Sequence, residues 1–208
     1  MAEPAFEKSV FINCPLDEEY EGILQAMLFC VVYLGFLPRI ATERADSAEN
    51  RLSKIIELIE ASQYSIHDLS RCQARAAGEY FRLNMPFELG IDFGCRRYVA
   101  RCKDKKILIL EQRRYQLKAA LSDLAGCDVE AHGEDHEKAV RKVRNWLVSE
   151  AGAEKIGAGS ILGKYADFQQ WYFERQLAAG FSEDDIKDYP TSELLAAMTE
   201  WMALGQPL

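Results

Sequence analysis

A glutamate inside an apolar segment is the first candidate for chemistry in this sequence. Glu88 stands between Phe87 and Leu89, where the hydrophobic neighbours predict burial. A carboxylate is expensive to bury unless it is paired, protonated or used in a reaction, so we look first at Glu88 for catalysis. The alternative is that Glu88 is a structural anchor that accepts hydrogen bonds, and both interpretations remain open at this stage.

An acidic residue also ends an apolar segment earlier in the chain. Residues 64–69 predict a strand, with Asp68 near its end and Ser70 just beyond it. His67 precedes Asp68, so its side chain points to the opposite face of the strand. We interpret His67 as a packed or capping histidine and Asp68 as a candidate ligand-binding residue.

The elements that must position these residues alternate between strand and helix. The apolar runs predict strands over residues 9–13, 36–41, 64–69, 106–110 and 128–132. Helical spacing predicts helices over residues 17–35, 47–62, 88–97, 116–124 and 136–151. We expect Asp46 or Ser47 to cap the second of these helices, and Pro38 places the second strand at the margin of the sheet.

Five rounds of strand and helix imply a parallel sheet with helices on both faces and right-handed crossovers. We therefore predict an α/β fold, a flavodoxin-like doubly wound five-stranded parallel sheet of order 2-1-3-4-5 over residues 1–152. A Gly-rich hinge over residues 152–163 separates this unit from the C-terminal helices. We assign residues 153–208, which include most of the hinge, to a C-terminal helical extension. The extension carries too many aromatic residues to sit in water, so we expect it to pack on its own domain or on a partner subunit.

Strands one and three are neighbours in a sheet of that order, and their following helices leave on opposite faces. This arrangement opens a crevice at the carboxyl ends of the two strands. The polar and turn residues that fall there are Asn13, Cys14, Pro15, Asp17, His67, Asp68, Ser70, Asn84 and Glu88. The start of the helix after the third strand also offers unpaired backbone N–H groups, which suit a phosphate or a ribose hydroxyl.

The sequence lacks the motifs that are typical of several classes of ligand-binding site. Neither G-x-G-x-x-G nor G-x-x-x-x-G-K-[ST] occurs, which disfavours a dinucleotide Rossmann site and P-loop phosphoryl transfer. The six cysteines form no C-x-x-C pair and have no close His, so the sequence indicates neither a zinc site nor a redox dithiol. Without an export signal we expect reduced thiols, and we also expect no metal and no bound cofactor. Cys14, at a strand end, is the one cysteine placed where reactivity would matter.

The composition limits the partners. The chain has 208 residues, 49% hydrophobic and 28% charged, which is ordinary for a soluble globular protein. Its net charge of −8 argues against binding nucleic acid, since that binding relies on Lys and Arg. The N-terminus lacks the pattern of a signal peptide, and the apolar run over residues 23–37 is too short to span a membrane. We therefore expect a cytoplasmic protein with no membrane partner.

The order of these motifs resembles that of a known family. An apolar strand ending in Asp, a loop, and then Asn-x-x-(Phe/Tyr)-Glu-Leu-Gly-x-x-x-Gly is similar to predicted nucleotide-binding, TIR-like proteins and to nucleoside 2-deoxyribosyltransferases. The matching residues are Asp68, Asn84, Phe87, Glu88, Leu89, Gly90 and Gly94. The opening, residues 10–15, also resembles the first strand and loop of that family.

The resemblance implies an activity. In those families the glutamate corresponding to Glu88 is catalytic in the cleavage or exchange of N-glycosidic bonds, and the aspartate corresponding to Asp68 contacts the substrate. The implied ligand is NAD or another nucleotide or nucleoside, with Phe11, Tyr80 or Phe87 stacking on its base. The expected substrate-binding residues are Asp68, Asn84, Phe11, Asn13, Cys14, Pro15, Ser70, Tyr80 and Phe87.

Two alternatives to a simple enzyme stay open. The chain is a non-catalytic module that senses a nucleotide or assembles with its own kind through the C-terminal helices, in which case Glu88 is structural. Alternatively, catalysis requires oligomerisation to complete the site, as TIR-like proteins imply. Both alternatives, like the enzyme hypothesis, are compatible with the homo-oligomer that we expect.

Overall fold

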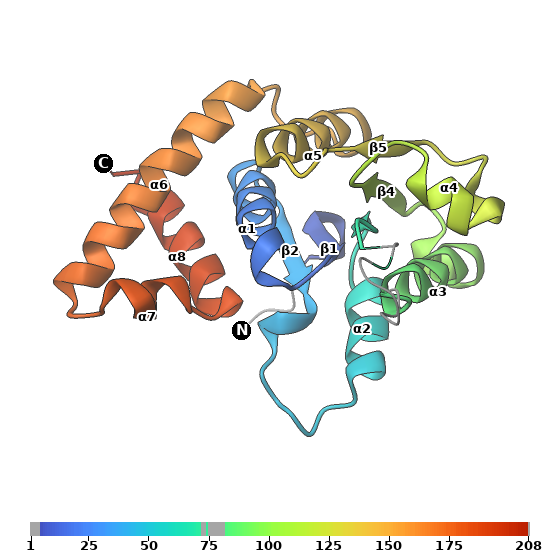
Figure 1. Cartoon of the computed structure of the whole chain (residues 1–208), viewed down its shortest axis with the longest axis horizontal. Helices are drawn as coiled ribbons and strands as arrows, with labels where there is room; N and C mark the ends of the chain where they lie inside the picture. The colour runs from blue at the N-terminus through green and yellow to red at the C-terminus, as the bar shows by residue number, and fades with distance from the viewer. Residues whose placement is uncertain (1–4, 72–73, 75–81, 208) are drawn as a thin grey trace.

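The computed structural model describes residues 5–71, 74 and 82–207, and it contains a parallel five-stranded sheet of order β2-β1-β3-β4-β5 (Figure 1). The strands are β1 (Ser9–Asn13), β2 (Leu37–Ile40), β3 (Tyr64–Asp68), β4 (Lys106–Glu111) and β5 (Val129–Ala131). The helices are α1 (Glu18–Tyr33), α2 (Arg51–Glu60), α3 (Asn84–Tyr98), α4 (Gln116–Ala120), α5 (His136–Ala151), α6 (Ala158–Ala178), α7 (Glu183–Lys187) and α8 (Thr191–Ala203). Short 3₁₀ turns are η1 (Phe6–Lys8), η2 (Ala41–Glu43), η3 (Ala100–Cys102) and η4 (Ser122–Leu124). The predicted flavodoxin-like α/β fold is confirmed.

The helices divide between the two faces of the sheet. On one face α1 and α5 pack on Val10, Ile12 and Ile66, and on the other α2 packs on Phe11. Successive side chains of a strand point to opposite faces, so the central residues of β1 meet a helix layer on one face or the other and are apolar. All five residues of β1 are buried, as this layered arrangement requires.

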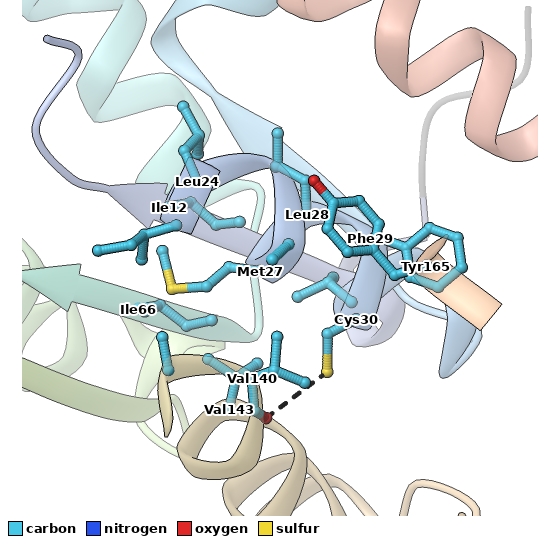
Figure 2. Packing of buried hydrophobic residues seen from close by; sticks show 14 of the residues in the cluster. Ile12, Leu24, Met27, Leu28, Phe29, Cys30, Ile66, Val140, Val143 and Tyr165 are labelled. Carbon is cyan, nitrogen blue, oxygen red and sulfur yellow. Dashed lines mark hydrogen bonds between the residues drawn. The ribbon is translucent and has the colours of Figure 1, made fainter. Parts of the chain in front are cut away.

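The larger core lies between α1 and α5. Figure 2 shows Met27 and Cys30 of α1 close to Val140 and Val143 of α5. The Cys30 thiol donates a hydrogen bond to the Val140 carbonyl at 3.9 Å. Cys30 is thus a small apolar core residue.

Two residues with unusual backbone constraints lie in β2 and in the turn before it. Pro38 has no N–H to donate and lies in β2, which is the edge strand that the sequence predicts. Gly35 ends the turn after α1 with a φ of +80°, a conformation that residues with a Cβ rarely adopt.

Two predicted helix starts are wrong. The α2 helix is capped by Asn50, whose side chain accepts a hydrogen bond from the Ser53 N–H at 3.0 Å, and not by Asp46 or Ser47. The α3 helix begins at Asn84, one turn before the predicted start at Glu88, with Pro86 in its first turn. For α2, Asp46, Ser47 and Asn50 are all favourable N-cap residues and lie close together in the sequence.

The predicted hinge over residues 152–163 is also too long. Gly152 ends α5 with a φ of +64°, but α6 already begins at Ala158. Gly159 and Gly163 therefore lie inside a helix that is stabilised by packing rather than by helix propensity.

The C-terminal extension packs on its own α/β domain, which was the first of the two expected arrangements. Phe29 of α1 stacks on Phe168 of α6 at 5.6 Å between ring centroids and meets Trp201 of α8 at 5.8 Å. Trp201 and Met198 are fully buried in the same cluster as the α1–α5 core. Within residues 5–71, 74 and 82–207, no helix is both long and apolar enough to cross a membrane.

Candidate functional site

The carboxyl ends of β1 and β3, where the sequence predicts a crevice, carry polar side chains on both faces of the sheet. Asn13 and His67 are register partners at the carboxyl ends of β1 and β3 and point toward α3. Asp68, the next residue, points toward α1 and contacts Tyr20. The polar residues therefore form two groups, one on each face.

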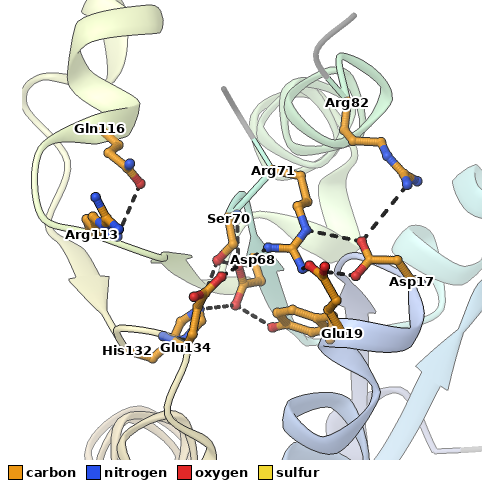
Figure 3. Close-up of polar contacts among 11 residues, drawn as sticks. Asp17, Glu19, Asp68, Ser70, Arg71, Arg82, Arg113, Gln116, His132 and Glu134 are labelled. Carbon is orange, nitrogen blue, oxygen red and sulfur yellow. Dashed lines mark hydrogen bonds and ion pairs between the residues drawn. The ribbon is translucent and has the colours of Figure 1, made fainter. Parts of the chain in front are cut away.

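The first group, which we name the Asp68 cluster, consists of Tyr20, Asp68, Ser70 and His132. The Tyr20 hydroxyl donates to Oδ2 of Asp68, and the Ser70 hydroxyl donates to Oδ1. The Ser70 N–H also donates to Oδ1 at 2.9 Å, and Nε2 of His132 lies 3.0 Å from Oδ2 (Figure 3). Four donors thus surround one carboxylate that is fully buried.

The loop after β5 fixes the orientation of His132. The Glu134 N–H donates to Nδ1 of His132 at 3.2 Å, which assigns the ring proton to Nε2, facing Asp68. Gly133 and Glu134 both adopt a positive φ, so the backbone takes an uncommon conformation to make this contact. Burial would raise the pKa of Asp68, but hydrogen bonds from His132, Ser70 and Tyr20 outweigh it and hold that pKa below its usual value.

Arg71 connects the loops around this cluster. Its guanidinium contacts both carboxylate oxygens of Asp17, at 3.1 and 2.9 Å, in a bidentate pair. It also lies 3.4 Å from Glu19 and 3.4 Å from Glu134. Figure 3 shows these acids converging on Arg71, which ties the segments after β1, β3 and β5 together. The hydrogen bond from Arg71 lowers the pKa of Asp17.

The second group, which we name the Asp92 chain, consists of Asn13, His67, Asp92 and Lys105. The Asn13 amide donates to Nδ1 of His67 at 3.0 Å, so Nε2 carries the ring proton and donates to Asp92 at 2.9 Å. The Lys105 ammonium lies 2.8 Å from the other oxygen of Asp92 and donates to the Ile59 carbonyl at 2.6 Å.

The Asp92 chain joins α3 to the ends of β1 and β3. The side chains of His67, Asp92 and Lys105 are fully buried. Burial would raise the pKa of Asp92, but His67 and Lys105 lower it to about 2. The amide of Asn13 also donates to the Met85 carbonyl at 2.9 Å, so this chain links the end of β1 to the first turn of α3.

Glu88 lies one turn before Asp92 on α3 and is only 6% exposed, which confirms the predicted burial. Its environment differs from that of the two aspartates. Burial raises the pKa of Glu88, and the charge of Arg51 and a hydrogen bond from the Asn84 side chain offset this only in part. Among the described residues, Glu88 has no set of donors like the one around Asp68.

Cys14 lies between the carboxylates of the crevice. Burial, and then the charges of Asp68, Glu88 and Asp17, raise the pKa of its thiol well above the usual value. The thiolate is therefore disfavoured, and Cys14 lacks the electropositive surroundings of a reactive cysteine. Pro15 beside it is buried as well.

The aromatic residues expected to stack on a base are placed differently from one another. Phe11 is 1% exposed and packs edge-on against His67 in the core, so a ligand could reach it only by displacing core residues. Phe87 is 59% exposed at the start of α3. Tyr80 lies outside the described residues. Asn84 is exposed beside Glu88, where a ligand can contact it.

Four residues of the two groups were assigned no polar role from the sequence: Tyr20, Asp92, Lys105 and His132. Tyr20 fits the apolar stripe of its helix, and His132 stands far from Asp68 along the chain. One signal was available for Asp92. It follows Glu88 by four residues in the same helix, so the two acids share one face, and that face is buried.

In the part of the chain that the structure describes, no three His, Cys, Asp or Glu side chains are arranged to hold a metal ion. Comparison of the chain with protein-family models, with curated proteins and with solved structures gives no match.

Proposed function

We propose that this chain binds a nucleotide or nucleoside, NAD in the first instance, at the crevice between β1 and β3 and cleaves or exchanges its N-glycosidic bond. Glu88 is the catalytic carboxylate in this proposal. The observation that carries it is the contrast in donors: within the described residues, Glu88 is buried without a set of hydrogen bonds like those that lower the pKa of Asp68 and Asp92. A buried carboxylate with few donors retains its capacity to interact with a positive centre.

The chemistry requires little else. Breaking the bond between ribose and a base develops positive charge on the anomeric carbon and the ring oxygen. A carboxylate beside that carbon stabilises the charge or forms a covalent bond to the carbon, which water or another nucleophile then displaces. Nicotinamide leaves NAD as a neutral base because its nitrogen is already cationic, so no general acid is needed.

The structure supports a different role for Asp68 from the one that the resemblance implies. Its oxygens accept hydrogen bonds from Tyr20, Ser70 and His132, and it is fully buried. We therefore propose that Asp68 positions the loop after β3 and does not hold ribose hydroxyls. Asn84 and Phe87, both exposed next to Glu88, are then the proposed substrate contacts.

The test is base release from NAD, NADP and a panel of nucleosides, followed by chromatography at high protein concentration. We expect release by the wild type and a loss of at least about a hundredfold in Glu88→Gln. Glu57→Gln, which removes an exposed carboxylate on α2, serves as the matched control and is expected to keep the wild-type rate. Equal release by wild type and Glu88→Gln would overturn the catalytic role of Glu88.

The second candidate function is a non-catalytic nucleotide-sensing module, which assembles with its own kind through the C-terminal helices. The hydrogen bonds and ion pairs of Asp68 and Asp92 favour this second candidate, because they give two of the acidic residues at this edge of the sheet a structural role. In that case a nucleotide raises the melting temperature of wild type and Glu88→Gln equally, with no base released from either. Repeating the assay across a range of protein concentrations separates this outcome from an enzyme that works only as an oligomer.

A further inference from the structure

A groove of about 670 Å³ lies between the start of α1 and the C-terminal helices, away from the crevice. Glu18, Glu21 and Gln25 line it from α1, and aromatic rings line it from the other side. Its volume is within the range of about 300 to 1,000 Å³ that is typical of small-molecule sites. The proposed function makes no use of this groove.

The aromatic wall comes from α6 and the segment before α8. Tyr165 and Phe168 are at least nine-tenths buried, and Phe173 remains 38% exposed. Tyr172 is 6% exposed, and its hydroxyl is buried near Gln176 without a well-formed hydrogen bond. The groove thus offers ring faces and one buried hydroxyl that lacks a regular partner.

The opposite wall is negatively charged. Among the described residues, Glu18 makes no ion pair, and Glu21 is contacted by an uncharged group, the Gln25 amide at 2.9 Å. Gln25 in turn accepts a hydrogen bond from Tyr165 at 3.5 Å, and the charge of Glu21 adds to burial in raising the pKa of that tyrosine. Lys187, which also lines the groove, lies 3.5 Å from Asp184.

We propose that this groove binds an organic cation, a primary or quaternary ammonium attached to an aromatic or aliphatic body. The ammonium lies against the carboxylates of Glu18 and Glu21 and against the face of Tyr165. Both the carboxylates and the quadrupole of the tyrosine ring attract it. The apolar body packs on Phe173 and Tyr189, which line the groove and keep exposed surface there. A neutral analogue loses the charge interaction, and an anionic one is repelled.

The first test compares three probes of the same shape by isothermal titration calorimetry: phenylbutylammonium, phenylbutanol and phenylbutyrate. We expect the cation to bind at least about tenfold more tightly than the alcohol and the anion to bind most weakly. Equal affinity for all three, or no binding of the cation, would overturn the proposal.

Two variants locate the binding. Glu18→Gln/Glu21→Gln is expected to reduce the affinity for the cation to that of the alcohol and to leave the alcohol unchanged. The control, Glu154→Gln/Glu174→Gln, removes the same charge outside the groove lining and should leave both affinities as they are. A loss of cation affinity of the same size in the control would contradict a local site.

The third variant fills the groove. A Cβ added at Gly22 meets nothing within 4 Å, and Gly22 lines the groove from α1. Leu is a better helix former than Gly, so Gly22→Leu should fold while its side chain occupies the space of the ligand body. We expect the cation and the alcohol to lose binding together, and undiminished binding with an unchanged circular dichroism spectrum would overturn the assignment.

Discussion

Asp68 and Glu88 are two buried carboxylates at the same edge of one sheet, and their surroundings are opposite. Asp68 is fully buried, accepts hydrogen bonds from two hydroxyls, a backbone N–H and an imidazole, and has a lowered pKa. Glu88 is nearly as buried, yet its pKa is raised because burial outweighs the help from Asn84 and Arg51. Burial alone therefore does not mark a functional carboxylate, since the number of donors decides which form it takes.

Asp92 sharpens the comparison because it shares a helix with Glu88. One turn apart on α3, Asp92 is paired with Lys105 and His67, while Glu88 has no such pair among the described residues. The helix and its dipole are common to both, so the difference comes from the side chains that β3 and the segment before β4 supply. Those segments supply His67 and Lys105, which stabilise the ionised form of Asp92.

The largest expected effect is that of removing an anchored carboxylate whose partner is a buried cation. Asp92→Ala leaves the Lys105 ammonium unpaired and fully buried, and we expect a loss of about 3 to 5 kcal/mol in the free energy of unfolding. Urea denaturation at pH 7 measures it. Asp92→Leu/Lys105→Met, which removes both charges, should regain most of the loss, and an equally unstable double variant would contradict the ion-pair account.

The Asp68 cluster predicts the next largest effect. Asp68→Ala leaves the donors of Tyr20, Ser70 and His132 without their acceptor, and we expect a loss of about 2 to 3 kcal/mol in unfolding free energy. Tyr20→Phe, which removes a single donor, should cost about 1 kcal/mol in the same urea titration. An Asp68→Ala protein as stable as wild type would contradict the claim that the hydrogen bonds to Asp68 stabilise the fold.

The sequence predicted the framework because local signals determined it. The aliphatic run before Glu111 predicts β4, and Asp135 and Gly152 stand at the two ends of α5, where the structure places its caps. These signals depend on neighbours along the chain, which a single sequence displays. The start of α2 was missed because Asp46, Ser47 and Asn50 are all good caps.

The anchoring of the site could not be predicted in the same way. Whether Asp68 or Glu88 is the satisfied carboxylate depends on His132 and Tyr20, which come from other elements of the fold. The sequence pattern marks both acids as site candidates and predicts burial for Glu88, but it contains no information on their donors. The contrast between them is a tertiary property, and it changed the role proposed for Asp68.

Lowering the pH tests how much the ionised form of Asp92 stabilises the fold. The folded pKa of Asp92 is about 2, below the value of about 4 in an unfolded chain, so the unfolded state binds more protons between these two values. The stabilisation is therefore present above about pH 4 and is lost as the pH falls toward 2, by on the order of 2 kcal/mol. Unfolding free energies of wild type and Asp92→Asn between pH 5 and 3 check this, and parallel curves would contradict it.

The smallest expected change is at Glu88, and its sign separates Glu88 from the aspartates. The pKa of Glu88 is raised in the folded protein, so the folded state binds the proton more tightly and stability decreases as the pH rises through that pKa. Glu88→Gln removes this penalty, and we expect it to be equal to wild type or more stable at pH 7, by less than about 1 kcal/mol, in the urea titration used for Asp68→Ala. A loss comparable to that of Asp68→Ala would place Glu88 among the anchors, and the proposed glycosidic chemistry would then lose the observation that carries it.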